Sequence, residues 1–146
     1  MSSPYLWQAE IASELSVAPD SVWALWNRPA RWSEWNPAIK ETRCSQPFTE
    51  GATAVVRFHR GPTLTFTIVA RERKRGFTGE ADIVGAQLGH EHRIWPHRDG
   101  IEVYHRVYFA GPLANLWGAV MGGRVRRHLV ALLANEKRLA WEVETA

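Results

Sequence analysis

AQLGHEHRIWPHRDGIEVYHRVYFA, residues 86–110, contains two strand-like runs on either side of the turn signal Pro96-His97-Arg98-Asp99-Gly100. In both runs apolar residues alternate with polar ones, which is the pattern of a strand that buries one of its faces. We therefore predict an antiparallel hairpin formed by Ala86–Trp95 and Ile101–Ala110.

The alternation also predicts which side chains of this hairpin face the interior, because successive side chains of a strand point to opposite faces. Three neighbouring runs define the apolar inner face through Ala54, Val56 and Phe58, through Leu64, Phe66, Ile68 and Ala70, and through Phe77, Ala81 and Ile83. By the same parity, the inward side chains of the first run are Leu88, His90, His92, Ile94 and Pro96. Those of the second run are Ile101, Val103, His105, Val107 and Phe109. Three of the six histidines therefore interrupt an apolar face.

The other face of the hairpin carries charged and aromatic residues: Glu91, Arg93, Trp95, Glu102, Tyr104, Arg106 and Tyr108. We interpret it as a solvated outer face with cross-strand ion pairs, whose aromatic side chains are a candidate homodimer contact. The inverted parity would make these residues the pocket and expose the histidines. Two registers also remain open. A loop from His97 to Gly100 pairs His92 directly with His105, whereas an Asp99-Gly100 turn places them on a diagonal.

Outward from the hairpin, the chain predicts one α+β domain over residues 1–146. Trp7–Leu15 alternates as a strand, a helix begins at Pro19, and a second short helix covers Pro29 to Trp35. The further strands are Ile39–Cys44, Thr53–Arg60, Leu64–Arg73 and Phe77–Val84, and the last element is a long helix from Asn115 to Glu142. This helix has an apolar stripe; we place Glu136 off that stripe and expect Gly122-Gly123 to weaken or kink the helix. This helix must cover the apolar face of a curved antiparallel sheet of seven strands. We expect a mostly apolar cavity at the end where the sheet and the helix diverge.

Composition narrows the class of protein. The chain has 146 residues, a net charge of +3 and one cysteine, and it lacks a secretory signal pattern, so we expect a cytoplasmic protein. The apolar stretch Phe109–Gly123 is too short for membrane insertion. Basic residues are not interleaved with aromatic ones, which argues against nucleic acid as a partner.

The chain has eight tryptophans, which is an unusually high number. Four of them, Trp23, Trp26, Trp32 and Trp35, could either fill the core or form the wall of a pocket.

The chain resembles the START/polyketide-cyclase superfamily, also called SRPBCC or Bet v 1-like, over nearly its whole length. The resemblance rests on residues 17–26, VAPDSVWALW, on residues 32–37, WSEWNP, and on Asp99-Gly100-Ile101-Glu102-Val103 and Gly111-Pro112-Leu113. It implies the helix-grip fold, in which a curved sheet wraps a long C-terminal helix and two short helices separate the first two strands. It implies little about function, because this superfamily includes cyclases, lipid carriers and quinone-binding proteins.

Three interpretations of His90, His92 and His105 remain. They are neutral, hydrogen-bonded core residues, or they bind a ligand oxygen and transfer protons, or they hold a metal ion. We disfavour the metal, because the sequence reveals no inward carboxylate or other group that would orient the imidazoles. We accordingly predict no metal and no cofactor, and we name His92 and His105, with His90, as candidate catalytic residues.

A second set of residues is expected to contact the ligand, although core packing explains them equally well. Trp35 lies at the expected gate, and Trp117, Met121 and His128 lie where the long helix meets the cavity. The complete predicted ligand-binding set is Trp35, Phe58, Phe66, Phe77, Ile94, Val107, Trp117, Met121 and His128.

Two functions follow from these residues. The first is an enzyme that cyclises, dehydrates or isomerises a small hydrophobic or aromatic, polyketide-like molecule by histidine acid–base chemistry. The alternative is a non-catalytic carrier or sensor of a lipid, quinone or aromatic metabolite; an interaction module is a third, weaker option. The sequence has no phosphate loop, G-x-S-x-G elbow or inward acid pair, so nucleotide-dependent, serine-hydrolase and glycosidase functions are disfavoured.

Overall fold

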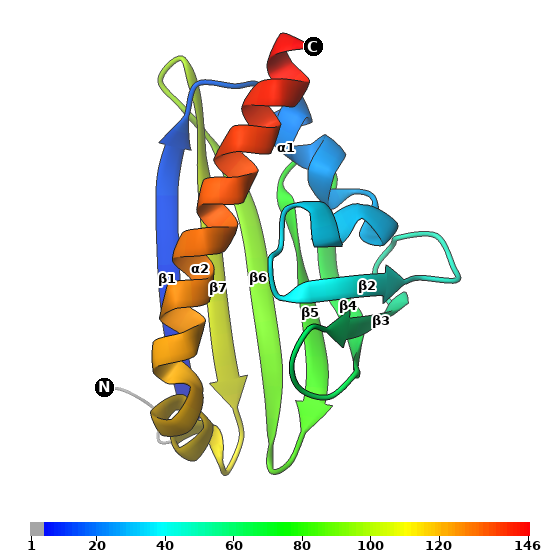
Figure 1. The fold of residues 1–146 in the computed structure, drawn as a ribbon, viewed down its shortest axis with the longest axis vertical. Coiled ribbons are helices and arrows are strands. Elements are labelled where there is room, and N and C mark those ends of the chain that lie inside the picture. The colour runs from blue at the N-terminus through cyan, green and yellow to red at the C-terminus, as the bar shows by residue number, and fades with distance from the viewer. Residues whose placement is uncertain (1–4) are drawn as a thin grey trace.

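The computed structural model describes residues 5–146; residues 1–4 of the predicted domain lie outside the described residues. Seven antiparallel strands form one sheet in the order β1-β7-β6-β5-β4-β3-β2. The long helix α2 crosses one face of this sheet over β1 and β7, and α1 and a 3₁₀ helix, η1, lie on the same side (Figure 1). In chain order the elements are β1 (Leu6–Leu15), α1 (Pro19–Trp26), η1 (Pro29–Glu34), β2 (Ile39–Arg43), β3 (Thr53–Phe58), β4 (Leu64–Glu72), β5 (Gly76–Ile83), β6 (Ala86–His97), β7 (Gly100–Ala110) and α2 (Ala114–Thr145).

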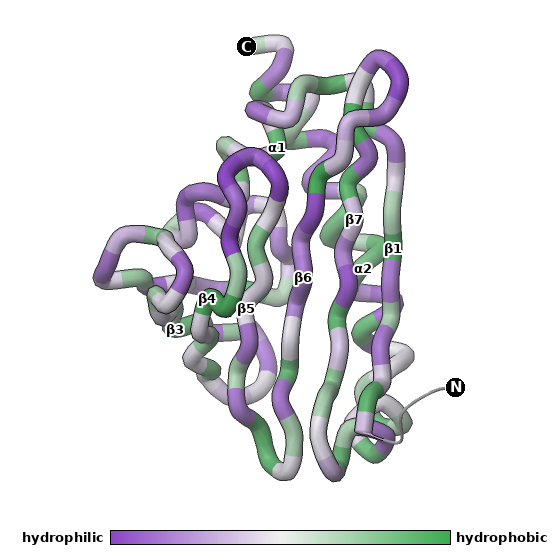
Figure 2. The backbone as a smooth tube through the Cα atoms, turned by 180° about the vertical axis from the view of Figure 1, so that it is seen from behind, coloured by the Kyte–Doolittle hydropathy of each residue, from purple (hydrophilic) through white to green (hydrophobic). Residues whose placement is uncertain are grey.

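This architecture confirms the predicted fold class. Pro19 opens α1 and Asp20 lies in its first turn, where an acidic side chain favours the positive end of the helix. Hydrophilic residues gather at the β4–β5 and β6–β7 turns, which project from one end of the sheet in the view from behind (Figure 2). Among residues 5–146, no helix combines the length and the apolar character needed to cross a bilayer.

The four clustered tryptophans fill the core beneath α1 and η1. Trp23, Trp26, Trp32 and Trp35 are all buried, and Trp32 stacks on Phe77 with ring centroids 5.3 Å apart. The indole N–H groups of Trp32 and Trp35 donate to the carbonyls of Trp26 and Leu25. Their polar atoms are thus satisfied within the core, and this end of the space between sheet and helix is filled by side chains.

The register of the β6–β7 hairpin is the direct one, with His92 paired to His105. His97 pairs with Gly100, so the turn consists of Arg98 and Asp99, and Arg98 adopts a left-handed φ of 49°. A two-residue turn with positive φ matches the twist of the flanking strands. This geometry brings the two histidines side by side on the inner face.

The parity predicted for β4 is wrong at its end. Ile68 is buried, but Ala70 is exposed, because a β-bulge between these residues shifts the register against β5. Arg71 follows the bulge and lies over the rings of Trp23 and Phe48, 5.1 and 5.3 Å from their centroids. An extra residue in one strand reverses the alternation beyond it.

The helix α2 runs without interruption through Gly122-Gly123, from Ala114 to Thr145. Gly118 and Gly122 form a flat seat for Trp7 of β1. A Cβ atom at Gly118 would come within 2.3 Å of the Trp7 ring, and one at Gly122 within 2.8 Å. Glycine on this face lets the helix approach the sheet closely around an aromatic ring.

Candidate functional site

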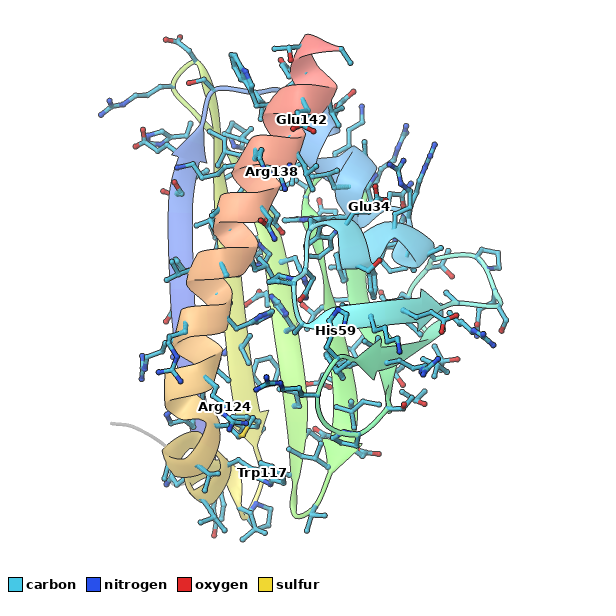
Figure 3. All side chains as sticks on the ribbon, viewed as in Figure 1. Glu34, His59, Trp117, Arg124, Arg138 and Glu142 are labelled. Carbon is cyan, nitrogen blue, oxygen red and sulfur yellow. The ribbon has the colours of Figure 1, made fainter. Side chains whose placement is uncertain are left out.

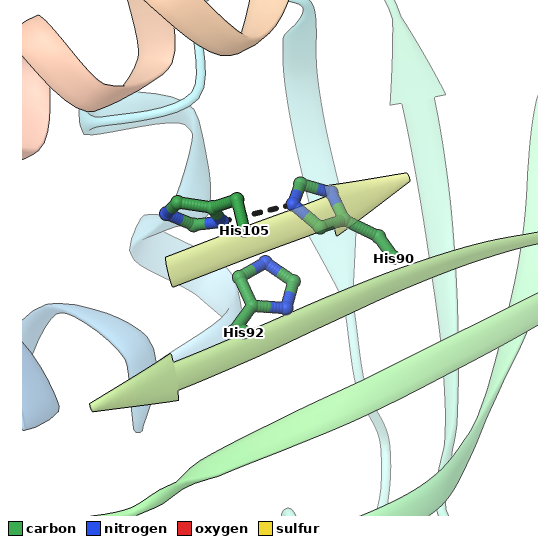
Figure 4. Close-up of side chains that lie close together, drawn as sticks. All are labelled: His90, His92 and His105. Atoms are coloured by element: carbon green, nitrogen blue, oxygen red, sulfur yellow. Dashed lines mark hydrogen bonds between the residues drawn. The ribbon is translucent and has the colours of Figure 1, made fainter. Parts of the chain in front are cut away.

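The three inward histidines meet at the centre of the inner face (Figure 4). His90 and His92 come from β6 and His105 from β7; His92 and His105 are buried and His90 is half-buried. A hydrogen bond of 3.0 Å joins His90 Nε2 and His105 Nδ1, and the rings of His90 and His92 stack with centroids 3.9 Å apart. Figure 4 shows one nitrogen of His92 directed toward the hydrogen bond between the other two rings.

Behind His105 lies a carboxyl group that the sequence analysis misplaced. Glu136 of α2 is fully buried, and its Oε2 lies 2.7 Å from Nε2 of His105, which is equally buried. The indole N–H of Trp26 donates to Glu136 Oε1 at 3.1 Å. The placement of Glu136 off the buried stripe is therefore wrong. We call the hydrogen-bonded series Trp26, Glu136, His105 and His90 the polar row.

A positional signal for Glu136 was present in the sequence. It lies three and four residues beyond Leu133 and Leu132 and four residues before Ala140, which are all buried. Residues at these spacings share one face of a helix. Helical position thus identifies Glu136 as buried, whereas its residue type favours the surface.

His92 is fixed by a different set of contacts. Its Nδ1–H donates to the carbonyl oxygen of Phe77 at 3.3 Å, because a carbonyl can only accept. In the neutral ring this leaves Nε2 with a free lone pair. The ring lies between Phe77 and His90, with centroid separations of 4.0 and 3.9 Å, and the edges of Trp26 and Trp35 close the remaining sides.

Burial favours the neutral form of His90, His92 and His128. It lowers the pKa of His90 and His92 well below the ordinary value of 6.5, and the charges of the neighbouring histidines lower both further. Burial, followed by the charge of His105, lowers the pKa of His128 on α2 to about 4. At neutral pH these rings therefore offer lone pairs and N–H donors rather than positive charge.

The predicted ligand-binding residues fall into two groups. Trp35, Phe77, Ile94 and Val107 are buried in the core, whereas Phe58, Phe66, Trp117, Met121 and His128 are only partly buried. Leu88 and His90 of β6 are also partly buried.

Trp117 lies at the opposite end of α2 from Arg138 and Glu142 (Figure 3). Its indole N–H donates to the carbonyl of Val84 at 2.8 Å, and its ring lies beside Phe109. His59, to which the sequence analysis gave no role, is exposed just after β3.

Two hollows stand out on the described surface, and neither lies between the sheet and α2. One, of about 180 Å³, is lined by Glu41, Arg43, Val55, Arg57 and Thr63. The other, of about 270 Å³, is lined by Glu72, Arg75, Arg93, Ile94 and Trp95. Neither hollow corresponds to the interior cavity that the sequence predicts.

The outer face has one predicted cross-strand ion pair in the hairpin, in which the Glu91 carboxylate of β6 is 2.9 Å from Nε of Arg106 on β7. Arg93, on the same strand as Glu91, forms a second ion pair with it. The Tyr104 hydroxyl donates to Glu10, and Trp95 packs against the Tyr104 ring at 5.3 Å. The histidines and this charged set thus lie on opposite faces of the sheet.

Comparison with solved structures confirms the helix-grip, SRPBCC-type fold. The di-domain ARO/CYC StfQ from the steffimycin biosynthetic pathway is 13% identical with a TM-score of 0.73, and the match covers 97% of this chain and 51% of StfQ. Norcoclaurine synthase from Thalictrum flavum, solved with dopamine and hydroxybenzaldehyde, is 10% identical with a TM-score of 0.70 and coverages of 94% and 87%. Ara h 8.0201 is 13% identical with a TM-score of 0.67 and coverages of 92% and 97%. No protein-family model and no curated protein matches the sequence.

Proposed function

We propose that this chain, acting as one cytoplasmic domain, binds a small hydrophobic or aromatic molecule against the partly covered inner face and acts on it at the histidines. The reaction class would be a cyclisation, dehydration or isomerisation next to a carbonyl group. The observation that carries the proposal is the polar row, which begins at buried Trp26 and ends at half-buried His90.

Filling a core with the side chains of the polar row costs free energy of folding. Burying a carboxyl group and imidazoles costs several kcal/mol unless each is hydrogen-bonded, and apolar side chains of similar volume are often at least as stable. Here each group has a partner, and the row ends where His90 is partly exposed. Such an arrangement serves a reacting ligand better than it serves packing.

The row offers a route for one proton. His90 Nδ1 would accept a proton from a C–H next to the ligand carbonyl, while His90 Nε2–H passes its proton to His105 Nδ1. His105 Nε2–H then passes a proton to Glu136 Oε2, so the charge formed at the ligand is balanced inside the protein. Return of the proton at another ligand atom completes an isomerisation, and its delivery to a leaving hydroxyl completes a dehydration.

The apolar partners for such a ligand lie next to His90. Gly79 of β5 pairs with His90 and is buried, and a Cβ atom there would be in ordinary contact with Phe66 at 3.5 Å and with Ile68 at 3.8 Å. Phe66 therefore packs over the strand beside His90, and Leu88 lies two residues before His90 along β6; both side chains are partly buried. A flat molecule that packs against Phe66 and Leu88 would present its oxygen to His90.

Proton abstraction can be tested without knowing the natural ligand. Small aromatic β-diketones are incubated with the protein in D₂O, and exchange of the C–H between the carbonyls is followed by NMR. Wild type should accelerate exchange, and His90→Phe, which retains a planar ring, should lower the rate by about 100-fold or more. His59→Ala, in an exposed position, should retain the wild-type rate. Equal rates for wild type and His90→Phe contradict the proposal.

The carrier or sensor alternative is favoured by the partly exposed apolar residues alone. It predicts that the same diketones or an anilinonaphthalene probe bind with micromolar affinity while no exchange occurs. Phe66→Ser should then weaken binding, whereas His90→Phe should leave it unchanged. Chemical change of the ligand thus separates the two functions.

A further inference from the structure

We infer that His90, His92 and His105 form a binding site for one divalent transition-metal ion of the Zn²⁺ type, with Glu136 and the Phe77 carbonyl orienting two of the three ligands. This inference rests on the proposed use of the same histidines as the reacting centre. It identifies the group that accepts the ligand's proton at this centre as a metal-bound water instead of a free imidazole.

The first argument is convergence. The ring nitrogens that the three residues offer all lie within 4.8 Å of one another. Zn²⁺ with Zn–N distances of about 2.0–2.1 Å requires its nitrogens to lie about 3.3 Å apart in a tetrahedral site. His90 Nε2 and His105 Nδ1 are already 3.0 Å apart, so this pair needs only a small widening. The His90 and His92 rings are stacked, with 15° between their planes, so the His90 ring must turn away from His92 before its Nε2 and the His92 Nε2 can bind one ion.

The second argument is orientation of the rings. A histidine that binds a metal usually donates its other ring N–H to a carboxylate or a backbone carbonyl, which fixes the tautomer. His105 has Glu136 Oε2 at 2.7 Å from its Nε2, which leaves Nδ1 for the metal. His92 donates Nδ1–H to the Phe77 carbonyl, which leaves Nε2. The group that the sequence did not reveal, an inward carboxylate, is thus present on α2.

The third argument is charge. Among residues 5–146, the hydrogen-bond and ion-pair partners of Glu136 are Trp26 and His105, and neither a lysine nor an arginine is among them. The hydrogen bond between His90 and His105 needs one proton between two nitrogens. A divalent cation can take the place of that proton, bind both lone pairs and compensate the buried carboxylate through His105.

The chemistry follows from the number of ligands. Three histidines leave one coordination position of a tetrahedral ion open, as in catalytic zinc sites. Only His90 of the three is partly exposed, so the open position would lie on its side, toward Phe66 and Leu88. An ion there would polarise a ligand carbonyl and carry an ionised water as the base, so the reaction class stays the same.

The test uses the full chain freed of metal by chelator and dialysis. Titration with Zn²⁺ by calorimetry should show one tight site, and Co²⁺ should give the visible absorption of four-coordinate cobalt. His90→Phe should weaken Zn²⁺ binding by about 100-fold or more, and Glu136→Gln by about 10–100-fold. His59→Ala is the matched control and should bind as wild type does.

The outcomes are separable. Absence of tight binding, or equal affinity of wild type and His90→Phe, overturns the site; unchanged affinity of Glu136→Gln overturns the orienting role of Glu136. If the metal-free protein exchanges the diketone C–H at full rate and binds no Zn²⁺, the proposed function stands and the metal site fails. If Zn²⁺ binds at one site and the loaded protein neither binds nor exchanges the diketone, the metal site stands and the proposed function fails.

Discussion

Replacement of Glu136 by leucine tests whether the polar row holds the sheet to α2. The change leaves two buried donors, the Trp26 indole N–H and the His105 Nε2–H, without an acceptor. Each unsatisfied donor costs about 1–3 kcal/mol, and the relief of burying a carboxyl group offsets part of the sum. We expect a loss of about 2–5 kcal/mol in the free energy of unfolding, or about 4–20 °C in Tm for a chain of this size.

Glu136→Gln should cost much less. The amide oxygen can accept from Trp26, and the amide NH₂ can donate to His105 Nε2 if the His105 proton moves to Nδ1 and its hydrogen bond to His90 reverses. Every bond of the polar row then survives, and the two bonds that His105 makes reverse their polarity, so we expect a loss of about 1 kcal/mol.

Urea unfolding of the metal-free variants, followed by tryptophan fluorescence, measures these differences, and nitrogen chemical shifts of the His105 ring report the tautomer. Glu142→Leu is the control on the same helix, because Glu142 is exposed and its removal should change stability by less than about 0.5 kcal/mol. If Glu136→Leu is as stable as wild type, or if the glutamine variant loses as much as the leucine variant, the reasoning is refuted.

Two further predictions concern packing and pH. Gly118→Ala should destabilise the protein by about 1–2 kcal/mol in urea unfolding, because its Cβ would clash with Trp7. At Gly123 only the Arg127 side chain is near, so Gly123→Ala should stabilise the protein by up to about 1 kcal/mol. The opposite order of stabilities would contradict the packing of Trp7 on Gly118. The metal-free protein should lose stability as the pH falls from 6.5 toward 4, because the unfolded chain takes up protons on His90, His92 and His128 that the fold excludes. A pKa of about 4 against 6.5 corresponds to about 3 kcal/mol, so urea unfolding at pH 7.5 and pH 4.5 should differ clearly, and the difference should shrink in His128→Gln. A flat profile in wild type would show that all three histidines take up protons in the fold as they do in the unfolded chain.

Strand alternation was sufficient to predict the inner face and the meeting of the three histidines. The pattern works because antiparallel strands with one buried face must repeat with period two, and His90, His92 and His105 share the parity of their apolar neighbours. It failed at Ala70, since a β-bulge adds a residue that no composition signal marks. The turn residues Arg98 and Asp99 could not be chosen in advance, because two turn types fit the same segment.

The helix was harder to predict than the sheet because residue type and helical position disagreed. Glu136 occupies a buried position of α2, yet charged residues are almost never fully buried unless paired, so its type placed it outside. Its partners, Trp26 and His105, are 110 and 31 residues away in the chain, and no local pattern links them. The effect of Gly118 and Gly122 likewise depends on Trp7, a residue of the first strand.

The position of the polar row within the fold argues for a reacting centre at the boundary between two halves of the interior. On one side, Trp26, Trp35 and Phe77 are buried and pack edge-on or face-on against His92, so no ligand can reach the histidines from there. On the other side, Phe66 and Leu88 remain partly exposed. Glu136 and His105 are fully buried, whereas His90 is the one histidine of the three that is partly exposed. A packing role would not require this gradient of burial along a continuous row of hydrogen bonds, whereas proton transfer or metal binding needs a fixed interior end and an accessible one.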